Sequence, residues 1–284
     1  MNIFIVGIGL IGGSLALDIR SHFPATVCYG IDSNKNHIKE GIALKIIDKE
    51  GSFDDLQLAD IVILSTPVGV ALELSTIILD HIGPQTLVFD VGSTKLPICE
   101  AIANHRNRSN FLLMHPIAGT EFSGPSAATL HLFQNKTNII CEVEKTSFKL
   151  QERALEIFKK IGMRIRYMDP KSHDKHIAYM SHLSHISSFM LGKTVIEIEK
   201  NERDIFDMAG SGFESTVRLA KSSPAMWTPI FEQNKEHVVK SLHEYITNLT
   251  KFKELLENDK FDEVYEQMQS TNRIKEILEG MKVG

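Results

Sequence analysis

The chain has 284 residues, which is long enough for two domains or one large domain. Hydrophobic residues make up 43% and charged residues 24% of the sequence, so there is ample material for a core. A net charge of −5 provides no basic surface for nucleic acid, and no segment is apolar and long enough to span a membrane. The N-terminus lacks the basic residues of a secretion signal, and the three scattered cysteines are typical of reduced thiols. We therefore expect a cytoplasmic protein.

The chain begins with a strand-like run and a glycine-rich turn. The near-continuous apolar run Asn2–Val6 leads into three glycines spaced GxGxxG, and a helical pattern follows over Ser14–Arg20. The first glycine allows a tight turn, the second lets the backbone approach a pyrophosphate, and the third lets the helix pack closely on the strand. The residues expected to hold a dinucleotide here are Gly7, Gly9, Leu10, Ile11 and Gly12.

An acidic residue follows at the spacing that dinucleotide-binding folds use. Asp32 ends the next strand-like run, Val27–Ile31, and lies 20 residues after Gly12. A carboxylate there accepts a hydrogen bond from the adenosine ribose 2′-OH and repels a 2′-phosphate. The sequence therefore predicts a dinucleotide-binding turn, and the alternative is an ordinary glycine-rich turn between a strand and a helix. The predicted dinucleotide is NAD rather than NADP.

Strand-like and helix-like stretches continue to alternate up to Asp169. The further strand candidates are Ile61–Leu64, Leu87–Asp90, Phe111–Met114, Thr137–Cys141 and Arg164–Tyr167, with helical patterns between several of them, as at Val70–His81 and Lys95–Asn104. This pattern predicts an α/β domain over residues 1–169, with a doubly wound, mostly parallel sheet of the Rossmann type.

Loops at the carboxyl ends of such strands bind ligands. Ser65, Thr66 and Pro67 follow one strand and are expected to line the cofactor pocket. His115 and Ser93 follow two others. A neutral imidazole beside a nicotinamide can accept the proton of a substrate hydroxyl, and a serine can bind the same oxygen. The alternative for His115 is a histidine that caps a loop.

From residue 170 to residue 284 helical periodicity dominates, and this segment is expected to form a second, all-helical domain. Apolar residues recur there at steps of three and four, as at Ile177, Met180, Leu183, Ile186, Met190 and Leu191. These apolar faces are longer than the α/β domain can cover. We therefore expect a second copy of the chain to cover them in a homodimer.

A serine and two histidines in the helical segment are candidates for substrate contacts. Ser181, His182 and His185 share a helix at a spacing that allows them to face the same way. A structural histidine is one alternative, and a metal site with nearby His173, His176 or Asp174 is another, although the spacing fits no metal-binding motif and none is expected.

An arginine and a tryptophan follow later in the helical segment. The planar guanidinium group of Arg218 is suited to binding a carboxylate. Its position in the helical pattern, taken alone, favours a surface ion pair instead. Trp227 is expected to lie in the core rather than on a pocket wall.

Five motifs occur in one order along essentially the whole chain. They are Gly7-x-Gly9-x-x-Gly12, Asp90-Val-Gly-Ser93-Thr-Lys95, His115-Pro-Ile-Ala-Gly-Thr-Glu121-x-Ser-Gly124, Ser181-His-Leu-Ser-His185, and Gly212-Phe213 through Arg218 to Met226-Trp227. Together they resemble the TyrA family of prephenate dehydrogenases. The histidine motif joined to the serine–histidine helix is the specific part of the resemblance.

The resemblance implies NAD-linked oxidative decarboxylation of prephenate to 4-hydroxyphenylpyruvate, in tyrosine biosynthesis, by a dimer joined through its helical domain. His115 would deprotonate the C4 hydroxyl of the substrate, and Ser93 would bind that hydroxyl. The other implied substrate contacts are Arg218 for a carboxylate, Ser181, His182 and His185 at the side-chain end, and Glu121 at the pocket mouth.

The sequence departs from the family pattern at Ser211, where a third glycine is expected before Gly212-Phe213. Because the helical segment runs to the last residue, Gly284, we expect no appended regulatory or chorismate mutase domain. Two alternatives remain open at this stage. One is an arogenate dehydrogenase, and the other is a non-catalytic dinucleotide-binding protein or sensor.

Overall fold

The computed structural model describes residues 1–200 and 203–283. The chain folds into two compact units, Met1–Lys235 and a second that begins at Glu236. Among the residues in those ranges, no helix is both long enough and apolar enough to cross a membrane.

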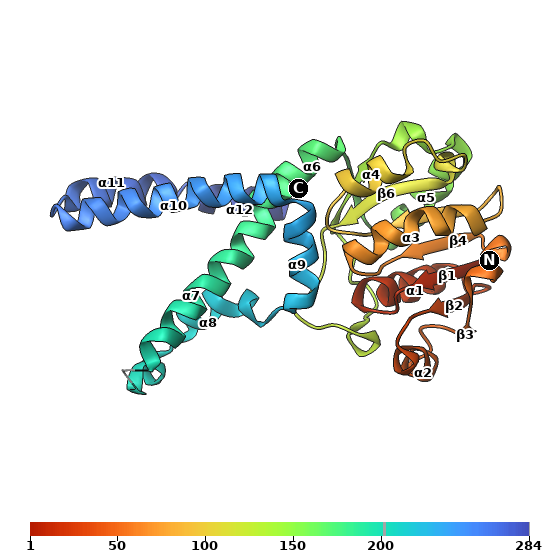
Figure 1. Cartoon of the computed structure of the whole chain (residues 1–284), viewed down its shortest axis with the longest axis horizontal. Helices are drawn as coiled ribbons and strands as arrows, with labels where there is room; N and C mark the ends of the chain where they lie inside the picture. The colour runs from red at the N-terminus through yellow and green to blue at the C-terminus, as the bar shows by residue number, and fades with distance from the viewer. Residues whose placement is uncertain (201–202, 284) are drawn as a thin grey trace. The chain divides into compact units, whose positions relative to one another are not determined.

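An eight-stranded sheet with helices packed around it forms the N-terminal part of the first unit (Figure 1). Its strand order is β3-β2-β1-β4-β5-β6-β7-β8. The strands are parallel from β3 to β6, β7 is antiparallel to β6, and β8 is parallel to β7. The strand bounds are β1 (Asn2–Val6), β2 (Val27–Ile31), β3 (Lys49–Glu50), β4 (Ile61–Leu64), β5 (Leu87–Asp90), β6 (Phe111–Pro116), β7 (Thr137–Cys141) and β8 (Arg164–Tyr167).

The predicted fold class is confirmed, and each of the seven strands expected from the sequence is present. Two features were not predicted. One is the short edge strand β3, and the other is the reversal of direction at β7.

Helices cover both faces of this sheet. Along β1, Ile3 and Ile5 pack into one apolar cluster, while Phe4 and Val6 pack into the other. The first cluster includes residues of α1 (Leu10–His22), α2 (Lys35–Ala43) and α5 (Phe148–Ile161), and the second includes α3 (Val68–His81) and α4 (Leu96–Ile102). Burial on both faces explains why these strands appear in the sequence as unbroken apolar runs.

The strand order reverses at β1, which has β2 on one side and β4 on the other. Gly7 follows β1 with φ +92°, and a Cβ atom there would lie 2.8 Å from the carbonyl oxygen of Ser65, which follows β4. At Gly12 in α1, a Cβ atom would lie 2.6 Å from the Gly7 carbonyl oxygen. The two glycines therefore allow loop, helix and strand to meet closely at the point where such sheets bind dinucleotides.

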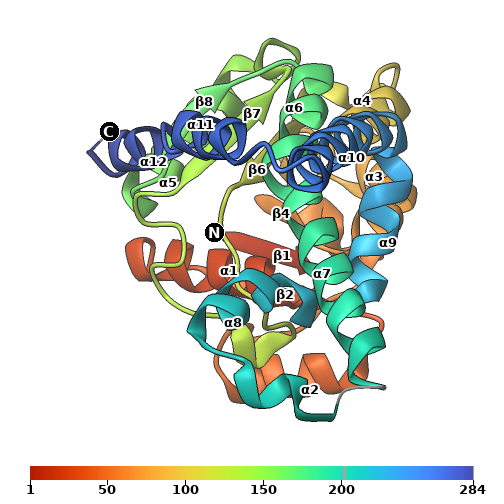
Figure 2. The same ribbon diagram turned by 90° about the vertical axis from the view of Figure 1, so that its left-hand side faces the viewer.

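The helical part of the first unit follows β8. It comprises α6 (Pro170–Ile177), a π-helical turn (Ala178–His182), α7 (Leu183–Glu199), a 3-10 helix (Arg203–Met208), α8 (Ser211–Val217), a 3-10 turn (Arg218–Lys221) and α9 (Pro224–Gln233). Asp169 caps α6 by accepting a hydrogen bond from the Ser172 N–H group at 2.9 Å. Helix α6 packs on α4, and α9 packs on α3 (Figure 2).

Several apolar residues that were expected on one helical face are exposed. Met180 is 68% exposed and Met190 is 50% exposed, and Ser188 is the buried residue of α7. The helical pattern was therefore predicted correctly, but none of the apolar side chains of α7 is fully buried within the described part of the chain.

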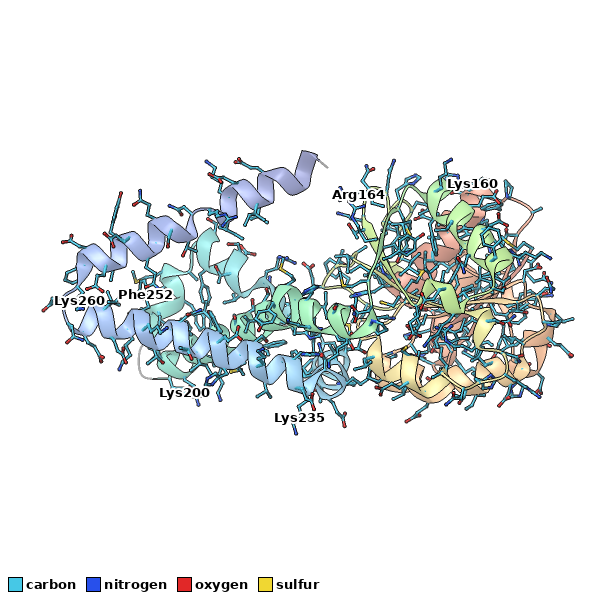
Figure 3. The ribbon with its side chains drawn as sticks, turned by 90° about the horizontal axis from the view of Figure 1, so that it is seen from above. Lys160, Arg164, Lys200, Lys235, Phe252 and Lys260 are labelled. Carbon is cyan, nitrogen blue, oxygen red and sulfur yellow. The ribbon has the colours of Figure 1, made fainter. Side chains whose placement is uncertain are left out.

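The second unit is helical. It contains most of α10 (Lys235–Glu257) together with α11 (Phe261–Thr271) and α12 (Ile274–Val283). Figure 3 shows α10, which carries Phe252, meeting α11 at the turn that contains Lys260. The absence of strand signal after residue 170 is confirmed for the described residues.

The close packing at Gly12 leads to a stability prediction. Gly12→Ala should lower the free energy of unfolding of the first unit by about 1–3 kcal/mol, because the new methyl group presses on Gly7 and Ser65. The matched variant is Gly9→Ala, whose Cβ meets no atom within 4 Å and which should cost less than about 1 kcal/mol as an altered helix cap. Chemical denaturation measures both, and equal losses would contradict the close approach of α1 to the Gly7–Ser65 contact.

Candidate active site

Ser93 and His115 lie at the same edge of the sheet. His115 is near the end of β6, and Ser93 follows β5, the parallel neighbour of β6. Both side chains are half-buried. Within the described residues, the Ser93 hydroxyl has no hydrogen-bond partner in the protein. The structure thus brings the two residues to one edge, as the sequence predicts, with a hydroxyl available for a ligand.

A buried lysine fixes the positions of these two loops. The Lys95 side chain is fully buried, and its ammonium group pairs with the Asp90 carboxylate and donates to the Met114 carbonyl oxygen at 2.8 Å. Asp90 Oδ1 also accepts a hydrogen bond from the Gly92 N–H group at 2.9 Å. The ends of β5 and β6, which precede Ser93 and carry His115, are therefore tied together by Lys95.

His115 contacts a second histidine that comes from α6. Its Nδ1 atom lies 2.8 Å from Nε2 of His173, and the His173 Nδ1 atom lies 2.7 Å from Oδ1 of Asp174. The sequence had suggested His173 and Asp174 only as metal ligands. No group of three or more His, Cys, Asp or Glu side chains within residues 1–200 and 203–283 is placed to hold a metal ion.

The surroundings of His115 keep its imidazole neutral. Burial lowers the pKa of His115 well below 6.5, and the nearby His173, Lys95 and His182 lower the pKa further. A neutral imidazole has an unprotonated ring nitrogen, so at neutral pH this group can accept a proton from a bound hydroxyl.

His182 is part of the same buried cluster. Its Nδ1 atom lies 3.3 Å from the Asn234 amide nitrogen, and burial lowers its pKa to about 4. Its Nε2 atom has no partner among the described residues. The sequence predicts a substrate contact for His182, but Trp227 and Phe231 pack edge-on against the fully buried ring, so this role stays a prediction.

His185 is more accessible and stacks on Trp227. The two ring centroids are 3.7 Å apart, and the Nδ1 atom of His185 donates to the Ser181 carbonyl oxygen at 2.9 Å. Burial lowers the pKa of His185 as well. His182 and His185 both contact Trp227, so they face one side of the helix as their spacing predicts, and Trp227 itself is buried as expected.

Arg218 reaches the loop that follows His115. Its Nη1 atom lies 3.4 Å from Oε2 of Glu121, and the side chains are 52% and 26% exposed respectively. The positive charge of Arg218 also contributes to the lowered pKa of His185. Arg218 thus lies near enough to His185 to affect its pKa, and it forms with Glu121 a half-exposed ion pair whose strength is modest.

The glycine loop has the features of a phosphate-binding site. Gly9 is the N-cap residue of α1 and provides no side-chain cap, so the N–H groups of the first turn remain available to a ligand. A Cβ atom at Gly9 would meet no protein atom within 4 Å. Leu10 and Ile11 form the start of the same turn.

The residues around that loop fit a dinucleotide. Asp32 Oδ2 accepts a hydrogen bond from the Ile8 N–H group at 2.9 Å, so the acidic side chain lies at the glycine loop. Ser65 donates to the Gly7 carbonyl oxygen at 2.6 Å, which makes it a support of the loop. The buried hydroxyl of Thr66 has no partner in the described part of the chain, and Pro67 is exposed beside it at the start of α3.

Comparison with known proteins identifies the family. Residues 15–167 match the nucleotide-binding domain of prephenate dehydrogenase, and residues 169–270 match its dimerization domain. The chain belongs to the prephenate dehydrogenase family. Its sequence is 31% identical to a prephenate dehydrogenase from Bacillus subtilis over 271 residues, which cover 93% of this chain and 72% of that protein.

Solved structures of the family agree with this assignment. A prephenate dehydrogenase from A. aeolicus in complex with hydroxyphenyl propionate and NAD+ has a TM-score of 0.89 and 32% identity, covering 98% of this chain and 97% of that one. An arogenate dehydrogenase from Synechocystis has a TM-score of 0.78 and 28% identity, covering 98% of this chain and 100% of that one.

Proposed function

We propose that this protein catalyses the NAD-dependent oxidative decarboxylation of prephenate to 4-hydroxyphenylpyruvate in tyrosine biosynthesis. The observation that carries the proposal is the convergence of Ser93 and His115 at the sheet edge that also holds the glycine loop. Glu121 lies in the loop after His115 and pairs with Arg218. The guanidinium group of Arg218 is the cation available for a substrate carboxylate. Family membership and the similarity to a relative whose structure contains NAD+ support the same activity.

Each group at this edge has a distinct role in the proposal. Neutral His115 accepts the proton of the prephenate C4 hydroxyl, and the Ser93 hydroxyl binds the same oxygen. Arg218 holds a substrate carboxylate, because its planar fork matches that group. The residues at the side-chain end and the mouth of the site are Ser181, His182, His185 and Glu121.

The chemistry requires the protein to orient the substrate, accept a proton and exclude water. NAD, when bound, accepts the hydride from C4. Loss of that hydride leaves the ring electron-poor, so the bond between C1 and its carboxylate breaks, CO2 leaves and the electron pair enters the ring. The proton on His115 then returns to the phenolate oxygen, so no net proton is released.

The cofactor residues proposed are those of the glycine loop and its neighbours. They are Gly7, Gly9, Leu10, Ile11, Gly12, Asp32, Ser65, Thr66 and Pro67. The carboxylate of Asp32 favours a ribose 2′-OH over a 2′-phosphate, so we propose NAD in preference to NADP.

The proposed activity is tested by following NADH formation with purified protein, with prephenate and with arogenate in parallel. The similarity to an arogenate dehydrogenase makes that substrate the second candidate. Activity with prephenate supports the main proposal, and activity with arogenate alone assigns the second. A protein that binds NAD but oxidises neither substrate is the non-catalytic alternative.

We also propose that the functional domains are residues 1–169, for the cofactor, and 170–284, for substrate and dimer contacts. The matched dimerization domain at residues 169–270 supports this division. A cytoplasmic location is supported by three cysteines that are free and buried, Cys28, Cys99 and Cys141.

The first prediction concerns assembly. The exposed apolar side chains of α7, among them Ile196 at 54% and Ile198 at 47%, favour a homodimer that covers them. Light scattering at micromolar concentration should give twice the chain mass of 31.9 kDa. A mass of one chain would contradict the dimer.

The second prediction concerns the base. His115→Asn should lower kcat by roughly 10²–10⁴-fold with little change in the dissociation constant of NAD. In the wild type, kcat should fall only below pH 6.5, because the pKa of His115 is lowered and the imidazole stays neutral until more acidic pH. Near-wild-type turnover of the variant, or a wild-type acid limb at or above pH 6.5, would exclude this role.

The third prediction concerns the carboxylate anchor. Arg218→Ala should raise the prephenate KM roughly 10- to 150-fold, the equivalent of about 1.5–3 kcal/mol, with a smaller effect on kcat. Arg218→Lys should recover part of the loss, since a point charge cannot reproduce the fork. Arg106, another exposed arginine in an ion pair, is the matched control, and Arg106→Ala should leave KM unchanged. If Arg218→Ala also leaves KM unchanged, the carboxylate is held elsewhere.

A further inference from the structure

His115 is the first member of a buried chain of three side chains. His173 and Asp174 continue this chain, at contact distances of 2.8 Å and 2.7 Å. The side chains of His173 and Asp174 are almost completely buried, at 0% and 2% exposed. Neither residue has a part in the binding and proton-transfer roles assigned above, so their placement behind His115 calls for a separate explanation.

The donors and acceptors along this chain can be assigned from its far end. Oδ1 of Asp174 accepts a hydrogen bond from the Lys95 N–H group at 2.8 Å, and Oδ2 accepts one from the Leu96 N–H group at 2.9 Å. An ionised carboxylate accepts hydrogen bonds and has none to donate. The Nδ1 atom of His173, which faces Oδ1, must therefore carry the proton.

The protonation of His115 follows from that of His173. Burial lowers the pKa of His173, so this ring is neutral, and with a proton on Nδ1 its Nε2 atom is an acceptor. The facing Nδ1 atom of His115 must then be the donor. In neutral His115 this leaves Nε2 unprotonated, and Nε2 is the nitrogen that is free to accept a proton from a ligand.

The chain is also anchored to the loop that carries Ser93. The two N–H groups bound by Asp174 lie at Lys95 and at the start of α4, immediately after that loop. The Asp174 carbonyl oxygen accepts a hydrogen bond from the Asn234 amide at 2.7 Å, at the end of α9. Asp174 therefore connects three elements around the site, so the His173 ring has little freedom to turn.

We propose that His173 and Asp174 are positioning residues that hold His115 in the form with a proton on Nδ1 and a free Nε2. Asp174 fixes the tautomer of His173, and His173 fixes the tautomer of His115. When Nε2 of His115 takes the substrate proton, the imidazolium donates to His173, and the Asp174 carboxylate stabilises the charge through that ring. The kinetic consequence rests on the proposed function, whereas the tautomer is a property of the unliganded protein.

A purely structural role for the pair makes a different prediction. In that case His173 only fills space, and its loss would alter stability without selecting a tautomer of His115. The test therefore needs a measurement of the proton position as well as of the rate.

The spectroscopic experiment uses protein labelled with 15N at histidine, without substrate or cofactor. Long-range 1H–15N correlation spectra distinguish a proton on Nδ1 from one on Nε2, and the signals of His115 are assigned by their loss in His115→Asn. We expect wild-type His115 and His173 to be protonated on Nδ1. A wild-type His115 protonated on Nε2 would overturn the proposal, whatever substrate the enzyme uses.

The kinetic experiment compares two substitutions of His173 with a control on the same helix. His173→Leu removes the acceptor and should lower kcat roughly 10²–10⁴-fold with little change in KM, and His115 should then show both tautomers. His173→Gln places an amide oxygen where Nε2 stood, so it should restore the Nδ1 proton on His115 and much of kcat. His176→Leu alters an exposed histidine of α6 and should leave kcat and the spectrum of His115 unchanged.

The outcomes separate this proposal from the proposed function. If the wild type oxidises neither prephenate nor arogenate, the activity is wrong, and the tautomer spectra of the wild type and of His173→Leu still decide the positioning role. If the wild type is active and His173→Leu keeps its kcat, or loses kcat with His115 still fully protonated on Nδ1, the positioning role is wrong. Thermal midpoints of each variant show which of them are folded.

Discussion

The site depends on the buried ion pair between Lys95 and Asp90. A fully buried ammonium group is tolerated only when its charge and its hydrogen bonds are satisfied, and Lys95 has the Asp90 carboxylate and the Met114 carbonyl oxygen as partners. One partner belongs to β5 and the other to β6. Separating the two strand ends would leave a charge unpaired in the core, so Ser93 and His115 are held at a fixed spacing by the cost of that separation.

The cofactor end of the sheet is organised by hydrogen bonds to the same groups that are expected to select the ligand. Asp32 binds the Ile8 N–H group inside the glycine loop, and its second oxygen accepts from the Asn34 N–H group at 2.8 Å. Ser65 binds the Gly7 carbonyl oxygen. A change at Asp32 therefore alters the support of the glycine loop as well as the acceptor that we propose for a ribose.

Local patterns predicted most of the fold because burial leaves a clear signature in the sequence. Strands covered on both faces contain unbroken apolar runs, such as Ile3–Val6 in β1. Strand β3 was not predicted because its two residues, Lys49 and Glu50, are exposed and charged. The antiparallel direction of β7 was not predicted either, because strand direction is set by pairing with β6 and not by the composition of the strand.

The sequence predicted the site residues that directly follow a strand, but not the contacts between residues far apart in the chain. Ser93 and His115 follow recognisable strands, and the carboxyl ends of strands are where ligands bind. The contact between His115 and His173 spans 58 positions in the sequence, and no spacing rule reaches that far. Lys95 begins a stretch with a helical pattern, where a lysine is usually exposed, so its complete burial had no signal in the sequence.

The π-helical turn Ala178–His182 joins α6 to α7 without a break. Such a turn contains one residue more than an α-helical turn, and each residue advances a helix by about 100°. Removing that residue would turn all of α7 about its axis relative to α6, moving His185 away from Trp227 and redirecting the exposed side chains from Met190 to Ile198 together. Insertions and deletions in this turn therefore change the His185–Trp227 contact and the outer surface of α7 at once, so natural variation in its length must alter both or neither.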